Sequence, residues 1–309
     1  MFTPRTLLFP TDGSACAERA RGYAVALAER FGADLHVLRV EIAGPAEIGF
    51  DALALTETDL AADLRLPRPE PAPSRRHTLD VKRKAIEAGP AILAYAAEVN
   101  ADLVVMGTHG RRGLRRLVLG STAEYVLRRA ASPVLLVSSD EAAAFGAGRI
   151  LVPDDFSAPA DRAFAVAHEI AREAGVGLDV LHVIEEVTVS SPYGALVAPP
   201  AEYASMTARA KEALRGRKKR ASAEAPTRVF VTLGDPVDEV LAHARQAGIG
   251  LIVMGSHGLT GFDRVLLGSV AEGVVRRAHC PVLVVKVGAR EAGAPAAQET
   301  IGVGTPTPV

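Results

Sequence analysis

The sequence of 309 residues contains no tryptophan, few aromatic residues (5%) and only two cysteines, Cys16 and Cys280. Two cysteines so far apart exclude the disulfide framework of a small secreted domain, and we expect both to be reduced thiols. With few aromatic rings, a core must be built mainly from Val, Leu, Ile and Ala side chains. An aliphatic core of this kind is typical of a parallel sheet covered by helices.

An excess of charge of one sign and long apolar runs are also missing. Lys and Arg (35) nearly balance Asp and Glu (36), so no strong positive field favours binding to nucleic acid or to an anionic membrane. No uninterrupted apolar run is long enough to span a bilayer, and Met1 leads almost directly into the apolar run 6–9 without a cleavable signal pattern. We therefore expect a cytoplasmic protein with no specific nucleic-acid partner and no membrane association.

The chain contains an internal duplication. Residues 106–137 and 254–285 share 19 identities in 32 positions without a gap. Earlier segments recur in the same order. LLFPTDGS at 7–14 corresponds to ILVPDDFS at 150–157, and the tripeptide LHV occurs at 35–37 and again at 181–183. The repeating unit is therefore a whole domain of about 140 residues and not a short solenoid module.

The duplication predicts two domains and a tail. We expect a first domain at 1–140, a second at 148–288 and a disordered tail at 289–309, which is rich in Gly, Ala, Pro and Thr. The polar segment 138–148 between the copies has the composition of a linker.

Within each copy, strand and helix signals alternate. In the first copy, apolar runs predict strands at the following positions: 6–9, 35–40, 103–106 and 134–137, with a weaker strand at 78–85. Ser14 predicts the N-cap of a helix over 15–31 that ends at Gly32, and Ser157 and Gly175 bracket its counterpart. This alternation predicts an α/β fold with a doubly wound parallel sheet in each domain.

Glycines recur at one spacing after the fourth predicted strand of each copy. They are Gly107, Gly110 and Gly120, followed by Ser121, and then Gly255, Gly258 and Gly268, followed by Ser269. Each set begins at the carboxyl end of a strand, where open α/β sheets place their ligands. Glycines let backbone N–H groups approach an anion, and the free N–H groups at a helix N-terminus favour phosphate.

The same residues also permit an interpretation without any ligand. Ser121 with Glu124, and Ser269 with Glu272, have the spacing of a helix-capping box. Taken alone, the serine at each helix start fits capping as well as phosphate binding. Three glycines at the same spacing after a strand, in both copies, favour the phosphate site.

The whole pattern resembles the universal stress protein family, as a tandem two-domain member. The resemblance rests on Gly-x2-Gly-x9-Gly-Ser after an apolar strand, on PTD after the first strand and on PVLLV or CPVLVV at the end, and it extends from Arg5 to Val287. It implies two five-stranded sheets of order 3-2-1-4-5 and binding of ATP or a related adenine nucleotide. Single-domain members of the family dimerise through the last strand, so the resemblance also implies an intramolecular pseudo-dimer, with any further homo-oligomer left open.

The resemblance assigns roles to particular residues. The motif glycines and Ser121 or Ser269 would hold phosphates and ribose. Asp12 and Asp155 would lie at the adenosine end, where they could also help to place Mg²⁺, and the backbone of Val37 and of Val183 would meet the adenine edge. The alternative for each aspartate is a turn or helix-entry residue.

Other candidate residues favour structural roles. We expect His109 and His257 to be structural loop residues, because no histidine has metal-ligand spacing. His36 and His182 lie inside apolar strands, and we expect them to be satisfied core residues. The run RGRKKR at 215–220 is typical of a solvated surface or linker. Four arginines in the first loop, Arg111, Arg112, Arg115 and Arg116, could clamp a phosphate, but solvated side chains are the simpler interpretation.

No residue stands out as a catalytic base or nucleophile, and the loop lacks the Gly-Lys-Ser ending of a hydrolytic phosphate loop. The main hypothesis is a stress-response or signalling protein that binds adenine nucleotides and acts on an unidentified protein partner or through its own conformation. A slow ATPase using the same sites and a scaffold without ligand affinity are the alternatives. Intact motifs in both copies argue against the scaffold.

Overall fold

In the computed structural model the described residues are 2–43, 78–109, 119–138, 145–185, 188–191, 194–197, 200–221, 224–257 and 267–286. Gly110, Gly258, the four loop arginines and the segment 289–309 lie outside these ranges.

The first domain alternates strands and helices as its sequence predicts. Its elements are β1 (Thr6–Pro10), α1 (Ala15–Phe31), β2 (Asp34–Ile42), β3 (Thr78–Ala85), α3 (Ala88–Glu98), β4 (Leu103–Gly107), α4 (Ser121–Arg129) and β5 (Val134–Val137). The second domain contains β6 (Arg149–Pro153), α5 (Ala158–Ala174), β7 (Leu178–Ile184), β8 (Thr188–Ser191), β9 (Gly194–Val197), α6 (Pro200–Arg220), β10 (Thr227–Leu233), α7 (Pro236–Gln246), β11 (Ile249–Gly255), α8 (Ser269–Arg277) and β12 (Val282–Val285). The described parts of both domains follow one plan, and the second also contains the β8–β9 hairpin and α6.

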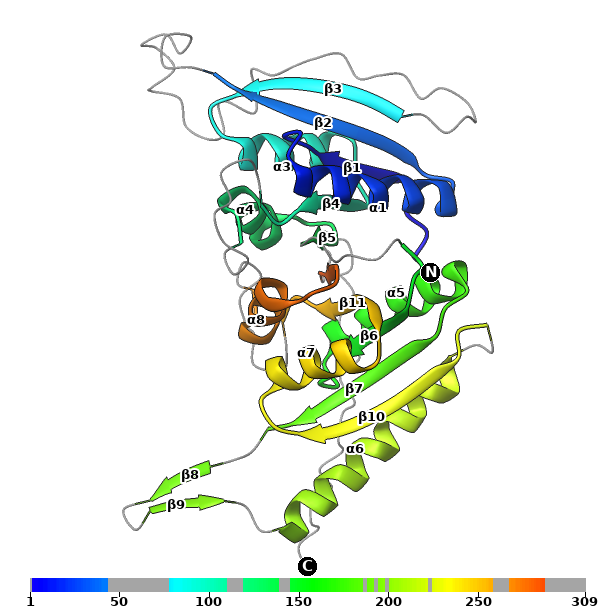
Figure 1. Ribbon diagram of the computed structural model, residues 1–309, viewed down its shortest axis with the longest axis vertical. Coiled ribbons are helices and arrows are strands. Elements are labelled where there is room, and N and C mark those ends of the chain that lie inside the picture. The colour runs from blue at the N-terminus through cyan, green and yellow to red at the C-terminus, as the bar shows by residue number, and fades with distance from the viewer. Residues whose placement is uncertain are drawn as a thin grey trace, which may run out of the picture.

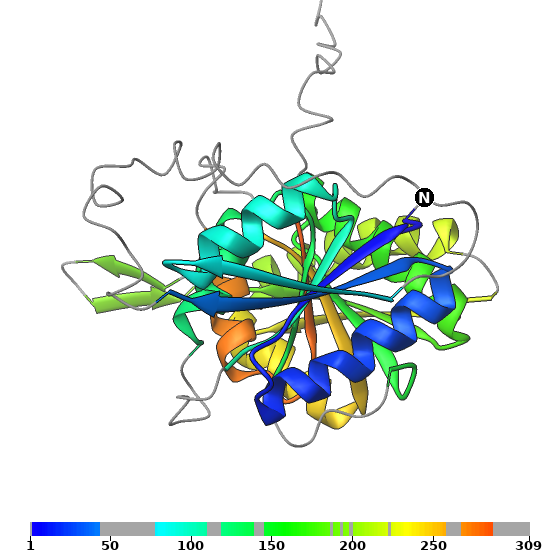
Figure 2. The same cartoon turned by 90° about the horizontal axis from the view of Figure 1, so that it is seen from above.

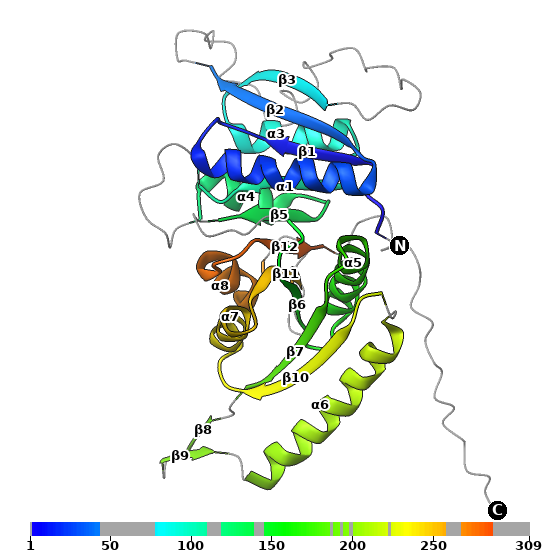
Figure 3. The same ribbon diagram turned by 45° about the vertical axis from the view of Figure 1, so that its right-hand side comes forward.

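All described strands except β8 and β9, which pair with each other, form one ten-stranded sheet that runs through both domains. Its order is β10-β7-β6-β11-β12-β5-β4-β1-β2-β3, so each half has the predicted order 3-2-1-4-5. The two halves meet where β12 pairs antiparallel with β5, with Leu283 opposite Leu135. The last strand of each domain therefore covers the open edge of the other, and the predicted intramolecular pseudo-dimer is confirmed (Figures 1 and 3).

Helices cover both faces of the sheet, and successive strand residues enter opposite core layers. In β1, Leu8 belongs to the layer under α3 and α4, whereas Leu7 and Phe9 belong to the layer under α1. Figure 2 shows α1 and α3 on opposite sides of the strands. Both cysteines are free and buried. This arrangement leaves the carboxyl ends of the strands as the edge where loops meet.

The first helix of each domain begins and ends where the sequence predicts. Ser14 Oγ accepts a hydrogen bond from the N–H of Ala17, and Ser157 Oγ accepts one from Ala160. Gly32 and Gly175 end the two helices with φ angles of 65° and 68°, a left-handed conformation that favours glycine. These capping predictions are confirmed.

The two domains differ in what covers their outermost strands. In the second domain α6 packs along β10, whose Val229 and Val231 contact the core layer that contains Leu214 of α6. In the first domain the strand register places Asp80 and Lys82 of β3 at the corresponding positions, and both are exposed. The charged residues suit an outer strand facing water, whereas the valines require the cover that α6 supplies.

Among the described residues, no helix is both long and apolar enough to cross a membrane.

Candidate functional site

Each domain has a cavity at the carboxyl ends of its first and fourth strands. The first is lined by residues that include Asp12, Gly107, His109 and Gly120, and has a volume of about 120 Å³. The second is lined by residues that include Asp155, Gly255, His257, Gly268 and Ser269, and has a volume of about 340 Å³. Only the second reaches the range of about 300–1,000 Å³ that is usual for small-molecule sites.

The inner wall of each cavity is apolar. In the first domain it includes Leu38, Val40, Ile92, Met106 and Ala123, and in the second Leu181, Val183, Val240, Met254 and Ala271. These side chains come from β2, α3, β4 and α4 and from their counterparts in the second domain. A wall that is mainly apolar, with polar groups at its rim, suits a ligand with a flat apolar part and a polar end.

The two predicted aspartates lie at one rim of these cavities and also shape the turn before the first helix. The N–H of Ser14 donates a hydrogen bond to Asp12 Oδ1 at 2.9 Å. Asp155 Oδ1 accepts hydrogen bonds from the N–H and the hydroxyl of Ser157, at 3.1 Å and 2.5 Å. The turn role considered for each aspartate is therefore real, and both residues also line the cavities.

The opposite rim is the N-terminus of α4 or α8, and the capping-box interpretation is wrong. The N-cap residues are Gly120 and Gly268, which have no side chain to accept a hydrogen bond, and Ser121 and Ser269 are the first helical residues and are exposed. Glu124 and Glu272 instead pair with arginines of the same two helices. The amides of each first turn thus receive no N-cap side chain, which suits an anion.

The first glycine of each motif is required by packing, whatever its role toward a ligand. A Cβ on Gly107 would lie 2.9 Å from Cys16 Sγ, and one on Gly255 would lie 2.7 Å from Pro159 Cβ. The start of α1 or α5 approaches the strand end too closely for any side chain there. Gly120 is also crowded, since its Cβ would lie 3.0 Å from the carbonyl oxygen of Thr108.

The strand register places Val37 outside the first cavity. Pro10 pairs with Leu38 in the first domain, and Pro153 pairs with Leu181 in the second. The structural counterpart of Val183 is therefore Val40, which lines the first cavity, whereas Val37 packs toward the layer under α1. The LHV tripeptides misled the sequence comparison because they occur three residues out of register.

The second site contains a buried ion pair that the sequence analysis missed. Asp154 lines the cavity, and its fully buried carboxylate accepts hydrogen bonds from Arg217 Nε at 2.6 Å and from the N–H of Phe156 at 2.8 Å. Arg217 belongs to the run RGRKKR, and its side chain is only 5% exposed, so the surface interpretation is wrong for this residue. The signal available in the sequence was the first acid of PDDF, Asp154, because a carboxylate buried at a strand end needs a partner.

The histidines differ in how far they match expectation. His36 is buried and its Nδ1 lies 2.8 Å from the hydroxyl of Tyr95, as expected of a core residue. His182 is partnered too, by the carbonyl of Asp154, but it lines the second cavity and contacts the ring of Phe156. His109 and His257 line the cavities, and their Nδ1 atoms lie 2.8 Å from the hydroxyls of Thr108 and Ser256.

Both loop histidines keep an unsatisfied atom. The Nε2 atoms of His109 and His257 are enclosed and have no hydrogen-bond partner among the described residues. Burial, together with the charge of Lys286, lowers the pKa of His257, so its ring is neutral near pH 7. Within the described part of the chain, no three His, Cys, Asp or Glu residues are grouped so that they could hold a metal ion.

Comparison with known proteins decides the family. The model of the universal stress protein family matches residues 3–138 and again residues 146–286. The chain belongs to the universal stress protein family. The two matches show a tandem two-domain member, as the duplication predicts.

Individual universal stress proteins agree with this assignment. One from Mycolicibacterium smegmatis is 34% identical over 213 residues, covering 68% of this chain and 70% of that protein. The Bacillus subtilis universal stress protein YxiE is 33% identical over 145 residues, covering 45% of this chain and 98% of its own. A solved universal stress protein from Archaeoglobus fulgidus, 22% identical, covers 92% of this chain and 98% of its own with a TM-score of 0.62, which shows the shared fold.

Proposed function

We propose that each domain binds one adenine nucleotide, ATP or a related one, with up to two per chain. The observation that carries the proposal is the common build of the two cavities. In both, an apolar wall lies between a rim aspartate and a helix N-terminus whose N-cap is glycine. A nucleotide has matching parts in the same spatial order, namely a flat base, a ribose and an anionic phosphate.

In this proposal the base lies against the apolar wall. The backbone of Val183, and of Val40 in place of Val37, meets the adenine edge, and Asp12 or Asp155 lies at the adenosine end. The phosphates approach Gly107, Gly120 and Ser121 in the first domain and Gly255, Gly268 and Ser269 in the second, with Gly110 and Gly258 in the connecting loops. Mg²⁺, where it is required, accompanies the phosphates.

The unsatisfied histidine nitrogens support a polar ligand in these cavities. A buried nitrogen without a partner costs free energy, typically about 1–3 kcal/mol. His109 and His257 line the two cavities, and the Nε2 atom of each has no hydrogen-bond partner among the described residues. A nucleotide oxygen is a suitable partner for this atom.

The output of binding is a change of conformation or of partner affinity, as in a stress-response or signalling protein. The two helices that begin at the two sites contact each other across the domain boundary. Arg128 of α4 pairs with Glu272 of α8, and Arg276 of α8 pairs with Glu124 of α4. A ligand that shifts either helix is therefore well placed to alter the arrangement of the domains.

Two measurements test the proposal. The purified protein is denatured and any released nucleotide is identified, and the nucleotide-free chain is then titrated calorimetrically with ATP, ADP, AMP and a cyclic nucleotide. We expect two sites in the unaltered chain, with one lost in Gly120→Val and the other lost in Gly268→Val. Absence of both released and titratable nucleotide would favour the scaffold.

The same preparation separates binding from hydrolysis. The described residues around the cavities include no base paired with an orienting acid, so we expect ATP turnover to be slow or absent. Turnover above about one per second, within the ordinary enzyme range, would instead establish the ATPase.

A further inference from the structure

The loop after β6 is held by a residue that lies 63 positions further along the chain. Arg217, near the end of α6, donates from Nε to Asp154 Oδ2 at 2.6 Å and from its terminal nitrogen to Oδ1 at 3.2 Å. The same guanidinium pairs with Asp161 and lies over the ring of Phe164, so it is enclosed between the loop and α5. This two-point contact holds the carboxylate in one orientation.

Through Asp154, the contact with Arg217 also restrains the cavity rim at Asp155. The backbone N–H of Asp154 bonds to Leu181, its carboxylate accepts the N–H of Phe156, and the residue between them is Asp155. Phe156 has a φ of 64°, a left-handed conformation that is costly for a residue with a side chain and persists only where its surroundings enforce it. The Arg217–Asp154 pair is part of that enforcement.

The described residues of the first domain include no such ion pair. The counterpart of Asp154 is Thr11, whose N–H makes the equivalent bond to Leu38, and the counterpart of Phe156 is Gly13, with a φ of 72°. Threonine carries no charge that needs a partner, and glycine adopts this conformation without strain. The two domains thus reach the same turn by different means, and only the second depends on α6.

We infer that Arg217 is a positioning residue for the nucleotide site of the second domain, and that it links the affinity of this site to the docking of α6. The inference rests on the proposed nucleotide binding. Without Arg217 the buried charge of Asp154 is uncompensated, so the carboxylate turns toward water and takes the loop with Asp155 along. Conversely, nucleotide that holds Asp155 in place strengthens the attachment of α6, because linkage acts in both directions.

The chain itself supplies the control substitution. Arg217→Ala leaves the charge of Asp154 without its arginine partner, whereas Arg217→Ala combined with Asp154→Thr gives the second domain the residue that the first domain uses. We expect Arg217→Ala to weaken binding at the second site about tenfold, and the added Asp154→Thr to restore most of the affinity. A residue that only packs α6 against the sheet would not be rescued in this way.

Each site is measured separately in the full-length chain. Calorimetric titration with ATP in the Gly120→Val background reports the second site, and the Gly268→Val background reports the first. We expect the Arg217→Ala effect only at the second site. An unchanged affinity there, or an equal loss at both sites in a chain that remains folded by circular dichroism, would overturn the inference.

A ligand-free measurement distinguishes failure of this inference from failure of the proposed function. Hydrogen exchange of the backbone amides of residues 154–157 should be faster in Arg217→Ala than in the unaltered chain, even with no nucleotide present. In the double variant the exchange rate should return to that of the unaltered chain. If the unaltered chain binds no nucleotide, the proposed function fails, while the exchange result still decides whether Arg217 positions the loop. Unchanged exchange in Arg217→Ala would refute the positioning role.

Discussion

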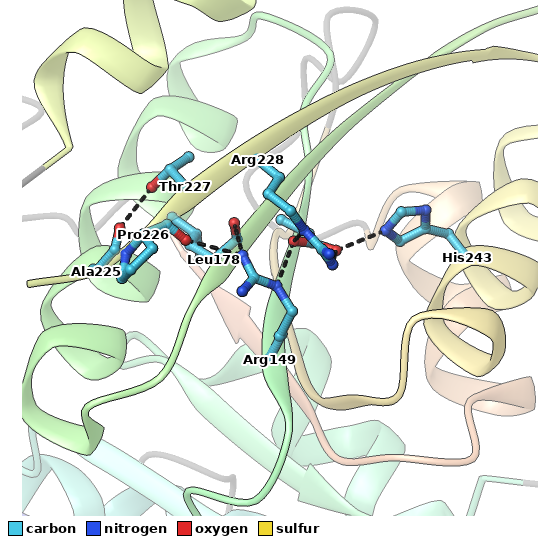
Figure 4. Close-up of polar contacts among 8 residues, drawn as sticks. Arg149, Leu178, Ala225, Pro226, Thr227, Arg228 and His243 are labelled. Atoms are coloured by element: carbon cyan, nitrogen blue, oxygen red, sulfur yellow. Dashed lines mark hydrogen bonds and ion pairs between the residues drawn. The ribbon is translucent and has the colours of Figure 1, made fainter. Parts of the chain in front are cut away.

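Replacing Asp179 by asparagine should destabilise the second domain. Asp179 lies on β7 with its side chain fully buried, and its two oxygens accept hydrogen bonds from Arg149, Arg228 and His243 (Figure 4). Burial alone raises the pKa of this carboxyl. Hydrogen bonds from His243, Arg228 and Arg149 outweigh burial and hold the pKa far below its ordinary value. The cluster joins three neighbouring strands to α7.

The expected loss of stability in Asp179→Asn follows from the properties of aspartate that asparagine keeps and those that it loses. It keeps the volume and one acceptor oxygen but removes the charge that balances two arginines. Removing one partner of a buried ion pair typically costs about 3–5 kcal/mol. Arg228 is half exposed and Arg149 about a quarter exposed, so water screens their charges. We therefore expect a loss of about 2–3 kcal/mol in the free energy of unfolding near pH 7.

The pH dependence has a definite sign. The folded pKa of Asp179 is lowered, so its contribution to stability is fully present above the ordinary carboxyl pKa of 3.8 and is lost as the pH falls toward the folded value. The difference between the unaltered chain and Asp179→Asn should be constant above about pH 5 and shrink below pH 4.

Urea unfolding followed by circular dichroism measures this difference. The control again comes from the first domain, where the corresponding pair is His36 with Tyr95, 2.8 Å apart. Asp179→His combined with His243→Tyr recreates that neutral pair but leaves both arginines without a carboxylate. It should therefore be less stable than the unaltered chain, as Asp179→Asn is. A loss below about 1 kcal/mol in Asp179→Asn would refute the argument that the buried charge holds the cluster together.

Three further outcomes are expected. Arg128→Ala with Arg276→Ala should lower stability by about 1–2 kcal/mol in urea, less at about 1 M NaCl, because these interdomain pairs are partly exposed; an effect independent of salt would contradict the ionic explanation. Gly255→Ala should cost about 1–3 kcal/mol by thermal unfolding, whereas Gly22→Ala, with open space around its Cβ, should stabilise by up to about 1 kcal/mol; equal effects would contradict the packing argument. Residues 1–146 expressed alone should self-associate through the edge of β5 that β12 covers in the whole chain, and a monomer in light scattering would contradict this.

Features encoded within a few neighbouring residues were predicted correctly. Ser14 and Gly32 bracket α1, and Ser157 and Gly175 bracket α5, because capping depends on groups within one turn of the helix end. The strand order and the pairing of β5 with β12 followed from the duplication and the family resemblance. The capping boxes were wrong by one residue, because the loop before each helix places glycine and not serine at the N-cap.

The sequence by itself determined the repeat, the alternation of strands and helices and the glycine-lined strand ends, since these are periodic or local patterns. Only the tertiary structure decided that Val40 and not Val37 corresponds to Val183, because register is set by pairing across the sheet and not by a shared tripeptide. It also decided that one arginine of a basic run is buried against Asp154. No local pattern marks which charge of such a run will be enclosed, because the partner is brought close only when α6 packs on the sheet and buries both groups together.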